Sequence, residues 1–178
     1  MVTSNAESTA IEPSFKRWWR NALYMPWRTQ QYFTSAQLEQ IEQSVVAAEA
    51  GNVGEVMVII EGNLPLDQAY RLDTRQRALD LFSMFRVWDT QYNSGMLLYV
   101  NLCERQVELL ADRNIHQFVT PEHWQTLCEQ VTSEFSQANY AKGVLKGVDL
   151  IGQTLQAFYT VKVEKDLGNE RSNRPILI

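Results

Sequence analysis

Five residues of this sequence have side chains suited to binding a cation or a phosphate, and each lies near a segment with the character of a β-strand: Glu55, Asp89, Asn93, Asp112 and Arg113. Carboxylate and amide oxygens are the ligands that Ca²⁺ and Mg²⁺ prefer in proteins. Arg113 follows Asp112 directly in the sequence. The side chains therefore suggest a divalent-metal site at Glu55, Asp89, Asn93 and Asp112.

Three strand-like segments must position these residues. Gly54–Glu61 and Met96–Leu102 are apolar runs of strand length, as expected for central strands covered on both faces. Gln106–Ala111 follows after the short turn Cys103–Arg105, which predicts a β-hairpin. If the first two strands are parallel, they begin at the same sheet edge and the third strand ends there. The topology therefore predicts that the four oxygen donors converge at one edge.

Apolar residues at helical spacing predict helices around this sheet. Three of these helices have clear start signals, which are the pairs Thr34 and Gln37, Asp73 and Gln76, and Thr120 and Pro121. The second helix is predicted over about 74–88, with Trp88 buried. The order helix, strand, helix, hairpin, helix, helix predicts an α/β fold. We expect a three-layer α/β/α sandwich with a small, mixed, mainly parallel sheet that includes one hairpin.

The bulk composition fits a soluble globular chain. It has 178 residues, of which 45% are hydrophobic and 21% charged. The net charge of −5 argues against a nucleic-acid binder. There is no signal-peptide pattern and no apolar run of membrane-spanning length, so we expect a cytoplasmic location. We divide the chain into a disordered N-terminus (1–12), a basic aromatic amphipathic arm (13–33), an α/β domain (34–160) and a C-terminal extension (161–178).

The arm has an unusual composition. Three of the five tryptophans lie between Phe15 and Arg28, interleaved with four basic residues. Tryptophan beside arginine suits a membrane interface or an acidic partner, and this would make the protein peripheral at the inner membrane. The same residues also suit a helix packed on the domain, with its rings buried and its cationic groups in water. The sequence leaves both interpretations open.

Each site residue also has a purely structural interpretation. Glu55 at a strand start could be simply solvated, and Asp89 could cap a loop. Asn93-Ser-Gly95 could be an ordinary turn, because asparagine and glycine tolerate the required backbone conformation. Arg113 could neutralise the acidic residues by a salt bridge instead of acting on a substrate.

Several segments, in this order, resemble the TPM domain, a family named after thylakoid-lumen, photosystem-II-repair and acetylcholine-receptor-modulator proteins. The resemblance covers about residues 34 to 158 and is carried by Gly54–Glu61, Ala78–Phe82, Trp88–Asp89, Asn93–Tyr99, Val107–Arg113 and Tyr140–Gly147. The opening basic aromatic segment is similar to that of a bacterial branch of this family. Members of that branch often accompany a second TPM protein and a LemA-type membrane protein.

The resemblance implies an α/β sandwich, and it implies Ca²⁺ binding or acid phosphatase activity in some members. The implied site residues are Glu55, Asp89, Asn93 and Asp112. Three positions depart from the pattern of the branch, namely Asn52 in place of His, Ser94 in place of a second Asn, and Asn114 in place of Gly. We expect Asn114 to be tolerated because asparagine accepts a left-handed backbone.

Three hypotheses of function follow. The first is a cytoplasmic TPM-like interaction module at the membrane surface, with an acidic divalent-metal site at one sheet edge and a LemA-type membrane protein or another TPM protein as partner. The alternative, which the family resemblance implies, is a metal-dependent acid phosphatase that hydrolyses phosphomonoesters. Its candidate catalytic residues are Asp89 and Asp112, which would hold a divalent ion that polarises the phosphate and activates water, and Arg113, which would stabilise the transferred charge. In the third, which is compatible with the first, Ca²⁺ only stiffens the loop Asp89–Gly95 and stabilises the fold.

Overall fold

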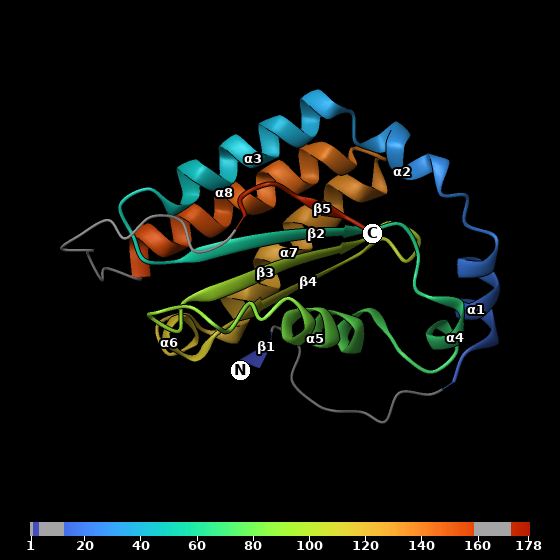
Figure 1. Cartoon of the computed structure of the whole chain (residues 1–178), viewed down its shortest axis with the longest axis horizontal. Coiled ribbons are helices and arrows are strands. Elements are labelled where there is room, and N and C mark those ends of the chain that lie inside the picture. Colours follow the sequence, from blue (N-terminus) through green and yellow to red (C-terminus); the bar gives the residue numbers. More distant parts are fainter. Residues whose placement is uncertain (1, 4–12, 159–171) are drawn as a thin grey trace.

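The apolar runs of the sequence form the centre of a mixed β-sheet. The structure is a computed structural model that describes residues 2–3, 13–158 and 172–178 (Figure 1). Within these residues the sheet has five strands in the order β1-β4-β3-β2-β5. Their bounds are Val2–Thr3 for β1, Glu55–Glu61 for β2, Gly95–Asn101 for β3, Gln106–Ala111 for β4 and Ile176–Leu177 for β5.

The central three strands have the predicted pairing. β2 and β3 are parallel, with Glu55 opposite Gly95, and β3 and β4 form the antiparallel hairpin. Arg105 closes the hairpin turn with a left-handed backbone (φ 54°). The outer strands were not predicted: β1 pairs antiparallel with β4, and β5 pairs parallel with β2. Most of the predicted disordered N-terminus and of the predicted C-terminal extension lies outside the described residues.

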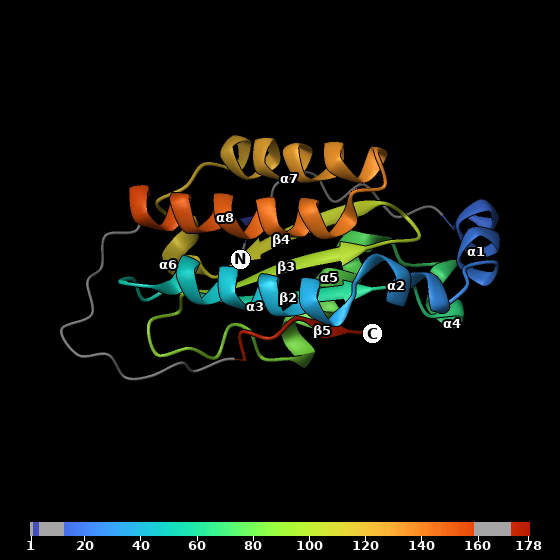
Figure 2. The ribbon, with the colours of Figure 1, turned by 90° about the horizontal axis from the view of Figure 1, so that it is seen from above.

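Helices cover both faces of the sheet (Figures 1 and 2). Their bounds are Phe15–Ala22 for α1, Trp27–Tyr32 for α2, Ser35–Glu49 for α3, Leu66–Ala69 for α4, Thr74–Met84 for α5, Arg113–His116 for α6, Pro121–Ser136 for α7 and Tyr140–Phe158 for α8. Helices α3, α7 and α8 pack on one face, and α5 packs on the other. This arrangement confirms the predicted three-layer α/β/α fold. Within the described residues, no helix is long and apolar enough to cross a bilayer.

The alternation of side chains along β2 divides the core into two clusters. Val58 and Ile60 face α3, α7 and α8, whereas Met57 and Ile59 face α5. Each of these four side chains is at least nine-tenths buried. Complete burial of one such side chain contributes about 1.5–3 kcal/mol, so the two-sided burial of β2 stabilises the centre of the fold.

The predicted helix starts are confirmed, because each depends on local hydrogen bonds. Thr34 and Gln37 form the complete capping box of α3, and Thr120 caps α7 with Pro121 at its first position. Asp73 caps α5, but this helix ends at Met84 and not near residue 88. The prediction that Trp88 is buried is therefore wrong, since its side chain is 49% exposed.

Candidate functional site

The start of the two parallel strands and the end of β4 form one edge of the sheet, which we call the amino edge. The Glu55 N–H donates to Ser94 O over 3.2 Å, and the Asp112 N–H donates to Gly95 O over 2.9 Å. Asn93 O accepts from the Asn114 N–H at 3.3 Å. The backbones of Glu55, Asn93 and Asp112 therefore meet at this edge, as the topology predicted.

Gly95 is the closest-packed point of the amino edge. A Cβ added there would lie 1.8 Å from the carbonyl oxygen of Val87, a separation that no side chain could occupy. The absence of a side chain lets the loop after α5 approach the first residue of β3. This loop contains Asp89, whose side chain is exposed.

The Asp112 side chain has a structural role at the amino edge. It is 8% exposed, and its Oδ1 accepts the Arg113 backbone N–H at 2.7 Å. Asp112 thereby caps α6, and its carbonyl oxygen accepts from Ile115 and His116. The Arg113 side chain is exposed to solvent. The Asp112 carboxylate is thus held in place by a helix start.

Two of the residues that depart from the family pattern, Asn114 and Ser94, lie at the amino edge. Asn114 lies within α6, so the left-handed backbone expected for it is wrong. Asn93 adopts that conformation instead, with φ 51°. The Asn114 side chain donates to Tyr92 O, and Ser94 is buried with its Oγ bonded to Val53 O at 2.5 Å. The Asn114 bond holds the loop before β3 against α6, and the Ser94 bond holds it against the loop before β2.

Glu49, the last residue of α3, is a further acidic residue that sequence reasoning missed. Its Oε1 accepts the Val56 N–H at 2.7 Å at the start of β2. Burial is the main cause that raises the pKa of Glu49 to about 7, and the nearby Glu55 carboxylate adds to this increase. The available signal was its position in the sequence, six residues before Glu55, the first residue of β2.

The amino edge does not present a ready cage for a divalent ion. Across residues 2–3, 13–158 and 172–178, no three Asp, Glu, His or Cys side chains are grouped as they would be around a metal ion. Asp112 also uses a carboxylate oxygen to cap α6. The divalent-metal site at Glu55, Asp89, Asn93 and Asp112 remains a prediction. Calorimetric titration of metal-stripped protein with Ca²⁺ and Mg²⁺ tests it. The unmodified protein should give a heat of metal binding, and this heat should vanish in Asp89→Asn and Asp112→Asn.

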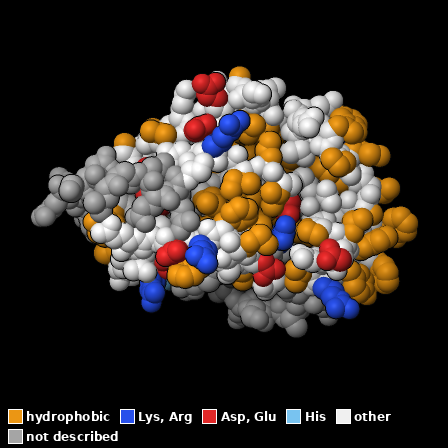
Figure 3. All heavy atoms as spheres, viewed as in Figure 1, with side chains coloured by type: hydrophobic (Ala, Val, Ile, Leu, Met, Phe, Trp, Pro, Cys, Tyr) orange, Lys and Arg blue, Asp and Glu red, His pale blue; other side chains and the backbone are white. Residues whose placement is uncertain are grey.

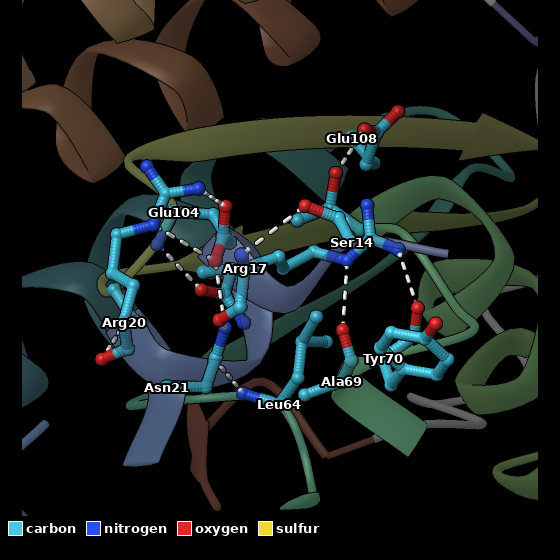
Figure 4. A network of polar contacts seen from close by, with 12 residues as sticks. Ser14, Arg17, Arg20, Asn21, Leu64, Ala69, Tyr70, Glu104 and Glu108 are labelled. Atoms are coloured by element: carbon cyan, nitrogen blue, oxygen red, sulfur yellow. Dashed lines mark hydrogen bonds and ion pairs between the residues drawn. The ribbon is translucent and has the colours of Figure 1, made fainter. Parts of the chain in front are cut away.

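The arm, residues 13–33, lies at the opposite end of the strands, which we call the carboxyl edge (Figure 1). Its first helix, α1, is fastened to the domain through polar groups (Figure 4). Arg17 donates from Nε to Ala69 O at 2.8 Å and from Nη2 to Tyr70 O at 3.2 Å. Arg20 forms an ion pair with Glu104 in the turn between β3 and β4.

Asn21 is the central contact between α1 and the domain. Its side chain accepts the Leu64 N–H and donates to Glu104 Oε1, each over 2.7 Å, and it also donates to Arg17 O over 2.8 Å. Asn21 is only 1% exposed. The inward face of α1 is therefore polar, although buried helix faces are normally apolar.

The outward face of the arm is apolar. Phe15, Trp19 and Leu23 are spaced four residues apart and lie on one stripe, and their side chains are 70%, 57% and 68% exposed. Met25 and Trp27 continue this exposed surface around α2. We call these five side chains the arm surface. Figure 3 shows hydrophobic side chains gathered at this end of the molecule. The interpretation of the arm as a helix with buried rings is wrong for Trp19 and Trp27.

A comparison with protein families shows to which family the chain belongs. The sequence profile of the TPM domain matches residues 28–154. The chain belongs to the TPM domain family. The match begins after α1 and contains β2, β3 and β4 with the helices from α3 to α7, whereas α1, β1 and β5 lie outside the matched residues.

Two solved structures are similar to this TPM protein. The NMR structure of BA42 from the psychrophilic bacterium Bizionia argentinensis has a TM-score of 0.69 and 23% identity, and the alignment covers 82% of this chain and 95% of BA42. The N-terminal domain of a protein from P. gingivalis has a TM-score of 0.59 and 20% identity over 70% of this chain and 76% of that domain. At these identities the likeness shows the fold alone. No curated protein matches the chain.

Proposed function

We propose that this TPM protein is an interaction module that docks on an anionic membrane surface through its arm, at the cytoplasmic face of the inner membrane. The observation that carries the proposal is the inverted amphipathicity of the arm: α1 contacts the domain through the polar Arg17 and Asn21, whereas the large apolar side chains of Phe15, Trp19 and Leu23 are exposed. Soluble proteins rarely expose a contiguous apolar patch of this kind unless it binds something.

The charge of the arm favours an anionic membrane as the occupant. Residues 13–33 contain four basic residues and no Asp or Glu, which gives the arm a formal charge of +4. Arg17 binds carbonyl groups of the domain and Arg20 pairs with Glu104. The exposed Lys16 and Arg28 are therefore the cations available to an anionic leaflet. Since the whole chain carries −5, the remaining residues carry −9. Aromatic and aliphatic side chains flanked by Lys and Arg are typical of helices that lie in the membrane interface. Each basic residue near an anionic leaflet contributes about 1 kcal/mol of attraction.

Flotation with protein-free vesicles of an anionic phospholipid tests the proposal. The triple variant Phe15→Ser, Trp19→Ser, Leu23→Ser should bind about 100-fold more weakly, because each truncation removes on the order of 1 kcal/mol of apolar burial. Val46→Ser is the matched control, since Val46 is 53% exposed on α3, away from the arm. Equal flotation of the triple variant and the control would contradict the proposal.

The arm surface could instead receive a protein, and the family resemblance names a LemA-type membrane protein or another TPM protein as the candidates. Protein-free vesicles separate the two cases. If the unmodified chain ignores vesicles but binds membranes that contain such a partner, the occupant of the arm surface is a protein.

The alternative function, metal-dependent phosphomonoester hydrolysis at the amino edge, is independent of the arm. It follows from the family resemblance, and the structure adds no specific support because the Asp112 carboxylate caps α6. A phosphatase assay with a generic ester tests it on Asp112→Asn. Asparagine also caps helices well, so this variant should keep the fold while losing the carboxylate charge. Turnover that survives the substitution would count against Asp112 as a catalytic residue.

A further inference from the structure

Beyond the arm surface, further exposed apolar side chains lie at the carboxyl edge. Leu66 begins α4, which docks on α1 through the Arg17 hydrogen bonds to Ala69 and Tyr70. Leu177 and Ile178 at the end of β5 are also exposed. Figure 2 shows α1 and α4 beyond the ends of β2 and β3, with α2 and the C-terminal end beside these strand ends. The apolar surface therefore extends across the end of the molecule.

Hydrogen bonds join these separate segments into one surface. Ile178 O accepts the Gly62 N–H at 3.0 Å, and the nearby Leu64 N–H donates to Asn21 of α1 at 2.7 Å. The rings of Phe15 and Tyr70 lie with centroids 4.8 Å apart. The C-terminal residues, the loop after β2, α4 and the arm are thus fixed relative to one another.

The amino edge, at the other end of the strands, has the opposite character. Four acidic residues lie there, Glu49, Glu55, Asp89 and Asp112, and they outnumber the two exposed basic residues of this edge, Arg86 and Arg113. Seven-residue strands separate the two edges by about 20 Å, because each residue advances a strand by about 3.3 Å. Docking through the carboxyl edge would hold these acidic groups more than two Debye lengths from the leaflet, as this length is about 8 Å at physiological ionic strength.

Accepting the proposed function, we infer that the domain docks end-on, with the carboxyl edge of its sheet against the anionic leaflet and the acidic amino edge directed away from it. In this orientation Leu66 belongs to the membrane contact together with the arm surface. The amino edge remains open to the solution. Docking through either helical layer would instead bring part of the acidic remainder of the chain against anionic lipid.

The tryptophans of the chain report this orientation directly. Trp19 and Trp27 belong to the arm surface, whereas the half-exposed Trp88 lies one residue from Val87, which touches Gly95 at the amino edge. Brominated acyl chains quench only those tryptophans that approach the bilayer interior. The experiment compares the emission of the full-length protein on anionic phosphatidylglycerol vesicles with and without brominated chains.

Quenching should be retained in full in Trp88→Phe and should fall to less than half in the double variant Trp19→Phe, Trp27→Phe. A matched pair of aliphatic variants gives a second readout. Leu66→Ser should weaken vesicle binding by about threefold to tenfold, while Met84→Ser, at the amino-edge end of α5 and 65% exposed, should leave it unchanged.

The possible failures are distinguishable. Vesicle binding whose quenching disappears in Trp88→Phe would overturn the end-on orientation while leaving membrane docking intact. Binding that Met84→Ser weakens as much as Leu66→Ser would overturn it in the same way. No binding to the vesicles at all would overturn the proposed function itself, and with it this inference.

Discussion

Asn21→Ala is the substitution that most sharply tests how the arm is held. Asn21 is 1% exposed and joins α1 to the Leu64 N–H and to the Glu104 carboxylate, both over 2.7 Å. Leaving a buried polar group without its partner costs about 1–3 kcal/mol. Glu104 keeps its ion pair with Arg20, so the free-energy cost at Glu104 should lie at the low end of this range. We therefore expect the docking of α1 to weaken by about 2–4 kcal/mol.

This loss corresponds to an increase of about 30-fold to 700-fold in the population in which α1 has left the domain. Hydrogen exchange read by mass spectrometry measures it. Exchange in peptides covering residues 14–24 should accelerate, whereas peptides from α8 should be unchanged, because arm opening is a local event. Gln30→Ala, an exposed position on α2, is the control. Equal exchange of the 14–24 peptides in both variants would refute the assigned role of Asn21.

Three further predictions concern the domain. Tyr99→Phe removes the hydroxyl that donates to the buried Glu61 carboxylate at 2.5 Å, and urea denaturation should show a loss of about 1–3 kcal/mol; an unchanged urea midpoint would contradict this. Glu49 has a pKa raised to about 7 in the folded state, so the folded protein binds more protons than the unfolded chain and stability should fall as pH rises from the ordinary glutamate value through about 7. Glu49→Gln should flatten this slope in urea midpoints measured across that range, and a slope that persists would assign it to another group. Gly95→Ala should destabilise the fold by about 3 kcal/mol or more, since the added Cβ would lie 1.8 Å from Val87 O, and a thermal melt within a degree of the parent would refute this packing.

The parts of the fold that depend on local signals could be predicted from the sequence. The helix starts at Thr34, Asp73 and Thr120 were found because capping uses residues within three positions. The meeting of Glu55 and Asp112 at one edge was also predictable, because strand lengths and a short hairpin turn fix the register. These features need no knowledge of distant contacts.

The parts that depend on distant contacts could not be predicted. α5 ends early, at Met84, because Arg86 adopts a left-handed backbone (φ 50°), and no glycine marks that position. The direction in which α1 faces depends on the contact of Asn21 with Glu104, 83 residues later in the chain. β5 is only two residues long, and its pairing with β2 joins positions more than one hundred residues apart. The orientation of the arm depends on such a distant contact, so its composition could not show whether its rings are buried on the domain or exposed.

The most direct test of membrane docking is a binding titration of the unmodified chain against phosphatidylglycerol and phosphatidylcholine vesicles at low and high salt. We expect tighter binding to phosphatidylglycerol, which weakens as salt is raised, because the exposed Lys16 and Arg28 attract an anionic leaflet and surface charges are screened over about 8 Å at physiological ionic strength. Absence of binding to phosphatidylglycerol, or equal binding to both lipids at every salt concentration, would contradict it.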